Sequence, residues 1–240
     1  MEFSKVTKAV RKVLPLRYCG AVIVAAGTAS RMGGIDKVMA QLGGEELIVR
    51  SVRAFQNCDA IREIIVVTRE DLIVKVTALC AQFSKVKAVV AGGADRPESV
   101  ANGLRALSSA MRLVAVHDGA RPLVTEAVID RTVRAAHIYS AAAPGVAVKD
   151  TIKVVQGGVV KETPARSGLQ AIQTPQVFDS SLLKAALQKA KEDKAEITDD
   201  CSAVERLGMS VKIVEGDERN MKVTTPMDLK MAALLLEEIV

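Results

Sequence analysis

The sequence predicts an α/β protein built on a doubly wound, mostly parallel sheet. Short apolar runs alternate with longer helical patterns through the first two thirds of the chain. The runs are apolar throughout, as is typical of parallel strands buried on both faces. With 240 residues, 49% of them hydrophobic, the chain can also bury the core of one such domain. We therefore expect a Rossmann-like sheet with helices on both faces.

The predicted elements follow one another as four strand and helix units. The predicted strands are 20–26, 63–68, 86–92 and 113–119. The predicted helices are 45–55, 71–83, 97–111 and 125–137. In sheets of this kind ligands bind beyond the carboxyl ends of the strands, so the segments after the strands are the expected place of a functional site.

From Ala141 the pattern changes to β-rich stretches. Two of them, 151–155 and 159–163, are separated by Gly157 and Gly158, which indicates a β-hairpin. A hairpin that projects from the sheet cannot bury both of its faces alone, so we expect residues 148–166 to form an arm that packs against a second subunit in a homodimer. Beyond it, the pattern predicts helices over 180–193 and 199–208, a strand over 211–216, and a last helix capped by Thr224 or Thr225.

Charge and composition argue against a protein that binds nucleic acid. The formal net charge is +5, and residues 1–19 carry Lys5, Lys8, Arg11, Lys12 and Arg17 against Glu2 alone, so the remainder is close to neutral. With two Tyr, four Phe and no Trp, the chain lacks the stacking residues of a nucleic-acid binder. We assign residues 1–19 as a basic N-terminal extension and 20–240 as a single domain. The extension has two interpretations, an amphipathic helix on a membrane or partner, and a surface cap.

The cysteines and the hydropathy pattern bear on location. Four cysteines stand far apart, without a CxxC pair or a histidine placed to complete a metal set. No apolar run approaches the roughly 18 residues of a membrane span. We expect a cytoplasmic protein without a membrane partner.

The segment after the first predicted strand, AAGTASRMGGIDK, carries the main chemical signal. It lacks the second glycine of a dinucleotide fingerprint, and its glycines do not have the spacing or the Lys–Ser/Thr pair of a P-loop. Small residues at Ala25, Ala26 and Gly27 would let backbone groups approach a ligand, and Arg31 and Lys37 add permanent positive charge. This combination predicts a polyphosphate site.

Six blocks in order resemble one enzyme family. AAGTASRM followed by DK is similar to the signature of sugar-phosphate nucleotidylyltransferases. The blocks AGGADRPESVANGL, VHDGARP, RSGLQAIQTPQVF, ITDDCSAVERLG and VEGDERNMKVTTPMDL resemble the cytidylyltransferases of the methylerythritol phosphate route to isoprenoids. The resemblance implies that CTP and 2-C-methyl-D-erythritol 4-phosphate react to give 4-diphosphocytidyl-2-C-methyl-D-erythritol and pyrophosphate, with Mg²⁺ as cofactor.

The same resemblance implies a role for each matching residue. The implied catalytic cations are Arg31, Lys37 and Lys222. The implied nucleotide-binding residues are Ala25, Ala26, Gly27, Gly93, Arg96, Ser99 and Asp118, the last either bonded to sugar hydroxyls or holding Mg²⁺. The implied residues for the polyol phosphate are Arg121, Thr151, Arg166, Thr174 and Thr198, with Thr151 and Arg166 acting across the dimer interface.

The chain departs from the family pattern at two places, and rival functions stay open. Ala29 replaces a common glycine, and Gln170 replaces a common tryptophan. One alternative is a cytidylyltransferase acting on ribitol 5-phosphate, which shares the nucleotide-side blocks. The other is a nucleotide-binding regulatory protein without turnover, against which the retention of Arg31, Lys37 and Asp118 argues. A dinucleotide oxidoreductase lacks its fingerprint here.

Overall fold

A computed structural model describes residues 18–27 and 37–237 of the chain. Its main sheet has eight strands in the order β10-β7-β11-β6-β1-β4-β5, with β12 also paired to β7. The central strands are β1 (Cys19–Ala25), β4 (Ile61–Thr68), β5 (Val86–Ala91) and β6 (Leu113–Asp118). They are parallel to one another, so the predicted α/β class with a mostly parallel sheet is confirmed.

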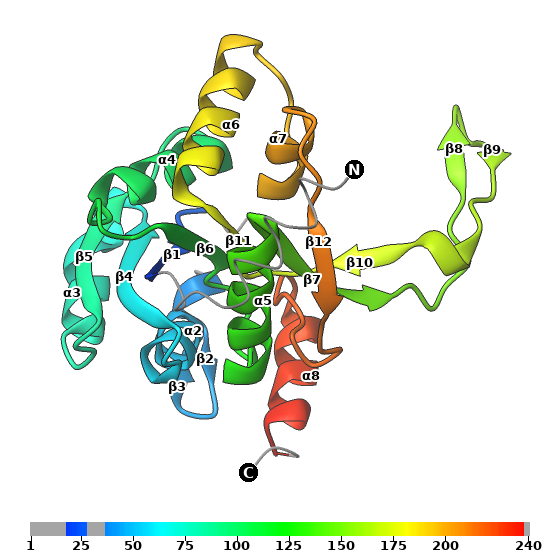
Figure 1. Cartoon of the computed structure of the whole chain (residues 1–240). Helices are drawn as coiled ribbons and strands as arrows, with labels where there is room; N and C mark the ends of the chain where they lie inside the picture. The colour runs from blue at the N-terminus through cyan, green and yellow to red at the C-terminus, as the bar shows by residue number, and fades with distance from the viewer. Residues whose placement is uncertain (1–17, 28–36, 238–240) are drawn as a thin grey trace.

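Helices cover both faces of this sheet, as predicted (Figure 1). One face carries α2 (Leu47–Asn57), α3 (Ile73–Cys80) and α5 (Glu126–Tyr139). The other carries α4 (Arg96–Ala106), α6 (Ser180–Glu192) and α7 (Asp200–Glu205). Strand β1 shows why two cores form: Ile23 packs in the first and its neighbour Val22 in the second, because successive strand residues point to opposite faces.

The other strands of the main sheet are mixed in direction. They are β7 (Ala141–Ala147), β10 (Gln170–Ile172), β11 (Gln176–Asp179) and β12 (Lys212–Glu215). Strand β11 lies between β6 and β7 and is antiparallel to both, while β12 is parallel to β7. Because β11 runs in reverse, the segment that precedes it lies at the same edge of the sheet as the carboxyl ends of the parallel strands.

A third apolar cluster attaches the C-terminal helix. Helix α8 (Pro226–Glu237) packs beside the small hairpin of β2 (Gln41–Leu42) and β3 (Glu45–Glu46). Its start matches the prediction, because the backbone N–H of Asp228 donates to the hydroxyl of Thr225. The prediction that Glu45 begins a helix was wrong, since the turn at Gly43 and Gly44, with φ of 58° and 77°, places the two glutamates in β3.

The predicted hairpin forms strands β8 (Val154–Gln156) and β9 (Val159–Glu162). Gly157 and Gly158 form its turn, with φ of 58° and 77°, values that L-residues rarely adopt. Figure 1 shows the hairpin projecting away from the body of the molecule. The chain leaves the main sheet after Ala147 and returns at Gln170, which pairs with Ala147 in the register of β7 and β10. Short 3₁₀ turns occur at Lys37–Met39, Glu70–Leu72 and Arg166–Gly168.

Within the described part of the chain, none of the helices has the length and hydropathy needed to cross a membrane.

Candidate active site

The candidate site is a pocket of about 510 Å³ at the carboxyl ends of β1, β4, β5 and β6. The strand ends converge there because parallel strands place their carboxyl ends at one edge of the sheet. The structure brings predicted residues from separate segments of the chain to this pocket. Those that line it are Ala25, Ala26, Gly27, Gly93, Arg96, Ser99, Asp118 and Lys222.

Asp118 is the centre of charge in the pocket. Its carboxylate lies 2.8 Å from Lys222 Nζ, 3.6 Å from Arg96 Nη2 and 3.8 Å from Arg121 Nε. Burial opposes its ionisation, but these three cations hold the pKa of Asp118 well below its usual range. Three cations therefore converge on one carboxylate, and the same cations could attract an anionic ligand.

Arg96 connects this cluster to a second buried acid. Its Nη1 lies 2.8 Å from Oδ2 of Asp200, which is 1% exposed at the start of α7. Burial raises the pKa of the Asp200 carboxyl, and Arg96 opposes that shift. Burial works against the charge on Arg96 too, yet Asp200 and Asp118 raise its pKa above the ordinary value. Arg96 is thus held as a cation between two carboxylates from different elements.

His117 and Thr174 hold the backbone that carries Asp118. Burial lowers the pKa of His117 to about 4, so the ring is neutral near pH 7, with one donor and one acceptor. The N–H of Asp118 donates to Thr174 Oγ1 at 3.1 Å, and that hydroxyl lies 2.9 Å from His117 Nδ1. If Thr174 donates to Nδ1, the proton is on Nε2, which lies 3.2 Å from the carbonyl of Arg121. The hydroxyl of Thr174 is thus engaged within the protein, and its predicted contact with a polyol stays a prediction.

The loop before α4 forms the opposite wall. Asp95 caps the helix by accepting the N–H of Glu98, and Ser99 accepts the N–H of Gly93 and donates to the carbonyl of Asp95. A Cβ on Gly92 would lie 2.4 Å from the Cβ of Ala26, so glycine is required where this loop meets the end of β1. The hydroxyl of Ser99 therefore shapes the loop that borders the pocket.

Other predicted residues lie elsewhere. Thr151 and Arg166 are exposed at the base of the arm, where Arg166 donates to the carbonyl of Lys149. Thr198 is exposed ahead of α7. Arg31 lies outside the described residues, and of Lys37 only the backbone, in a 3₁₀ turn, is described.

Arg69 and Asp200 are among the contributors to the site that the sequence analysis missed. Arg69 lines the pocket directly after β4, and the strand-end rule that pointed to Asp118 would have found it. Asp200 could not be found in that way, because the acid pair Asp199–Asp200 indicates a helix start; Asp199 is indeed the cap of α7.

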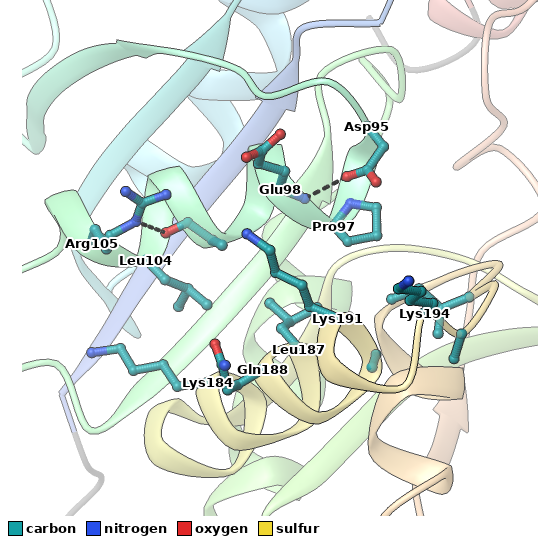
Figure 2. Close-up of a pocket in the computed structure, with 14 residues that line it drawn as sticks. Asp95, Pro97, Glu98, Leu104, Arg105, Lys184, Leu187, Gln188, Lys191 and Lys194 are labelled. Carbon is teal, nitrogen blue, oxygen red and sulfur yellow. Dashed lines mark hydrogen bonds between the residues drawn. The ribbon is translucent and has the colours of Figure 1, made fainter.

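A second cavity, of about 720 Å³, lies between α4 and α6 and shares only Asp95 with the lining of the charged pocket. Figure 2 shows Leu104 and Leu187 on its apolar side and Lys184 and Lys191 at its rim. None of the predicted site residues lines it. The charged pocket, and not the larger groove, is therefore the candidate site.

The metal prediction rests on one carboxylate. In residues 18–27 and 37–237, no three His, Cys, Asp or Glu side chains are grouped to hold a metal ion. A single carboxylate fits Mg²⁺, which takes most of its ligands from substrate phosphates and water. Asp118 is compatible with that arrangement, because it lines the pocket and Lys222, one of its partners, is 40% exposed.

The fold and the pocket define an α/β protein with a cluster of charged side chains at the carboxyl ends of parallel strands. A model of the 2-C-methyl-D-erythritol 4-phosphate cytidylyltransferase family matches residues 19–238. The chain belongs to this family, and the resemblance found in its sequence blocks is confirmed.

Individual relatives agree with this assignment. The cytidylyltransferase of that name from Caldanaerobacter subterraneus subsp. tengcongensis is 44% identical over 227 residues, covering 91% of this chain and 98% of the relative. The one from Geobacillus kaustophilus is 45% identical over 219 residues, covering 90% and 96%.

Solved structures show the same fold. The 4-diphosphocytidyl-2C-methyl-D-erythritol synthase of Anaerococcus prevotii superposes with a TM-score of 0.84 at 31% identity, covering 92% of this chain and 96% of that one. The 2-C-methyl-D-erythritol 4-phosphate cytidylyltransferase of Thermus thermophilus gives 0.74 at 32% identity, covering 92% and 99%.

Proposed function

We propose that this protein transfers the cytidylyl group of CTP to 2-C-methyl-D-erythritol 4-phosphate, within the non-mevalonate isoprenoid pathway. The products are 4-diphosphocytidyl-2-C-methyl-D-erythritol and pyrophosphate. The observation that carries the proposal is membership of the cytidylyltransferase family over residues 19–238. The charge of the pocket supports it, because the substrates of this reaction are polyanions.

The chemistry requires positioning and positive charge. An oxygen of the sugar phosphate attacks the α-phosphorus of CTP, and the bond from that phosphorus to the bridging oxygen of the β-phosphate breaks. Negative charge accumulates on the α-phosphoryl oxygens and on the departing pyrophosphate. Lys222 is suited to this charge, because it lines the pocket and its ammonium is paired with Asp118 while the side chain stays partly exposed. We assign Arg31 and Lys37 the same task at the triphosphate.

Base and ribose recognition falls to the α4 loop and the end of β1. Gly93, Arg96 and Ser99 border the pocket opposite Ala25, Ala26 and Gly27. Backbone groups can match the N4 donor and the N3 and O2 acceptors of cytosine, and a narrow pocket rejects purines by size.

Asp118 is the residue that would hold Mg²⁺. When bound, the ion would neutralise charge on the phosphates. Lys222 would turn from the carboxylate of Asp118 to a phosphate oxygen, leaving that carboxylate for the ion or for ribose hydroxyls.

The acceptor site requires a second subunit. We assign the polyol phosphate to Arg121, Thr174 and Thr198, completed by Thr151 and Arg166 of residues 148–166. The last two lie on the arm, away from the pocket of their own chain, which fits a role across a homodimer interface. The enzyme would act in the cytoplasm, with residues 1–19 as an extension of the single domain 20–240.

Pyrophosphate release by the purified protein tests the function. The assay supplies CTP and Mg²⁺ with either 2-C-methyl-D-erythritol 4-phosphate or ribitol 5-phosphate. We expect release with the first acceptor only, at least about 100-fold slower in Lys37→Ala. Lys184→Ala, an exposed lysine of α6 outside the pocket, is the matched control and should keep full activity.

Other outcomes would contradict the proposal. Release with ribitol 5-phosphate alone would keep the chemistry and change the substrate. CTP binding without release from either acceptor would identify a regulatory nucleotide-binding protein.

A further inference from the structure

Lys222 lies in an irregular segment that is held by side-chain hydrogen bonds from other parts of the chain. Residues 217–223 lie in the connection between β12 and α8 and form neither a helix nor a strand. Such segments are ordinarily among the more mobile parts of a fold. Here two residues that flank Lys222, Asn220 and Val223, are fully buried, although the lysine itself is partly exposed.

Asn220 is the centre of these contacts. Its side-chain Nδ2 donates to the carbonyl of Thr174 at 2.9 Å and to Oε1 of Gln173 at 3.3 Å. Its own carbonyl accepts from Nη1 of Arg121 at 2.6 Å. One residue thus joins the segment before β11, the loop after β6 and the segment that carries Lys222.

Gln173, a hydrogen-bond partner of Asn220, also bonds the backbone at the start of the same segment. Its Nε2 donates to the carbonyl of Asp217 at 2.8 Å, and its Oε1 accepts the N–H of Asp217 at 3.2 Å. Gln173 is 4% exposed, so its amide and that of Asn220 are paired in a site almost closed to water. Loss of Asn220 would leave the buried carbonyl of Thr174 without this partner, and loss of Gln173 would leave the backbone N–H and carbonyl of the partly buried Asp217 without theirs, which is costly enough to displace the segment.

The backbone transmits this anchoring to the pocket. The N–H of Val223 donates to the carbonyl of Ala120 at 2.8 Å, so the position of Lys222 is fixed between Asn220 and the Asp118 loop. Neither Asn220 nor Gln173 lines the pocket. Their effect on a ligand can therefore only be indirect.

We propose that Asn220, with Gln173 as its partner, is a positioning residue that sets where the Lys222 ammonium lies relative to the reacting phosphate. This rests on the proposed cytidylyl transfer and on the role of Lys222 in it. A displacement of about 1 Å in a group that stabilises a transition state can cost on the order of 100-fold in rate. Substrate binding draws on several other cations and depends less on this one group.

A double-mutant cycle tests the proposal through steady-state kinetics. Asn220→Ala should lower kcat at least about tenfold while the KM for CTP changes less than about threefold. In a Lys222→Ala background the same substitution should change kcat less than about twofold, because the group that Asn220 positions is gone. Gln173→Ala should lower kcat by a similar factor. The kcat of the Asn220→Ala, Gln173→Ala double variant should lie within about twofold of the slower single variant, because both substitutions remove the same anchoring.

A matched control separates positioning from general destabilisation. Thr132 is fully buried on α5, away from the pocket, and its hydroxyl donates to the carbonyl of Val128. Thr132→Val should lower the midpoint of thermal unfolding without lowering kcat at about 25 °C. Circular dichroism at the assay temperature establishes that each variant is folded.

The outcomes distinguish this proposal from the function on which it rests. A wild-type protein without turnover would remove the proposed function itself. An active wild type whose kcat is unchanged in Asn220→Ala, or falls by the same factor with and without Lys222, would overturn the positioning role alone.

Discussion

Asp118 is the acid on which the cations of the pocket converge. It is the shared partner of Lys222, Arg96 and Arg121, and its side chain is only 12% exposed. A buried acid surrounded by cations is strongly coupled to them, because removing one sign of charge leaves the other uncompensated. The stability of the fold and the affinity for anions therefore depend on the same residue.

Asp118→Asn should lower the free energy of unfolding by about 3 kcal/mol, since Lys222 and Arg121 lose this carboxylate partner and Arg96 is left with Asp200. Urea unfolding measures the change. Inorganic pyrophosphate should raise the midpoint of thermal unfolding more in the variant than in the wild type, because an anion in the pocket replaces the missing charge. Asp130→Asn, which breaks an exposed pair with Arg134 on α5, is the control and should cost less than about 1 kcal/mol. Equal losses in the two variants would contradict this coupling.

His117 makes stability depend on pH. Its folded pKa of about 4 lies below its ordinary value of 6.5, so between these values the unfolded chain binds a proton that the folded protein does not. Stability should fall by about 2 kcal/mol as pH drops from about 7 to about 5 through this one group. The lowered pKa of Asp118 acts in the same direction at lower pH, and the raised pKa of Asp200 acts in the opposite direction.

Urea unfolding of wild type and His117→Gln at several pH values isolates that contribution. The variant should show a flatter dependence between about pH 7 and pH 5. An unchanged slope would mean that the imidazole is not the titrating group.

At this scale the sequence was most informative where a local rule applied. Asp118 was found because it ends an apolar strand, and Arg96 because it lies in a recognisable block. Asn220 and Asp200 lie in such blocks too, but their contacts could not be predicted, since each acts through partners that are distant in the sequence and brought close only by the fold. The burial that lowers the pKa of His117 is likewise a property of the assembled core.

The hairpin of β8 and β9 exposes apolar side chains that the described part of its own chain does not cover. Val154, Val155, Val159 and Val160 are each about half exposed, an arrangement that a short two-stranded unit does not sustain alone. These valines belong to residues 148–166, the arm that we assign to the homodimer. Exposed apolar side chains gathered on one projecting element are a common mark of an interface.

If the arm forms the proposed homodimer, replacing Val155 and Val160, which pair across the hairpin, by aspartate should give monomers in analytical ultracentrifugation, where the wild type sediments as a dimer. CTP affinity should stay within about threefold, because the nucleotide pocket lies in one chain, whereas turnover should fall at least about tenfold. Val74→Asp, on the exposed side of α3, is the matched control and should alter neither property. A variant that stays dimeric would place the interface elsewhere.

Among the elements, alternating strand and helix patterns were predictable and strand partners were not. Strand β11 is only four residues long, and nothing in its sequence indicates that it lies antiparallel between β6 and β7. Partner and direction depend on packing against the rest of the sheet. Helix ends were similarly displaced: α4 ends at Ala106, where the apolar pattern had suggested Met111.

For the whole molecule, the fold class and the family could be predicted from the sequence, whereas the role of the basic residues 1–19 could not. The family match begins at residue 19, where β1 also begins. The basic residues of 1–19, the last of which is Arg17, thus all come before the first strand of the sheet.

A chain lacking residues 1–17 should therefore fold and react like the complete one. We expect its thermal midpoint within about 3 °C and its kcat within about twofold of the full chain, because the described core and the pocket begin at β1. Calorimetry and the pyrophosphate assay check both values. A clear loss in either would give the extension a part in the enzyme.

The register of β7 with β10 gives the arm a particular independence. The segment between Ala147 and Gln170 leaves and re-enters the sheet at directly paired positions. The pairing of β7 with β10 therefore holds the two ends of the segment together, independently of the residues between them. Its length and sequence can change without shifting the strands that shape the nucleotide pocket. Insertions or substitutions in the arm should thus change the subunit contacts and the acceptor site that the arm completes, while the binding of CTP within each chain is kept.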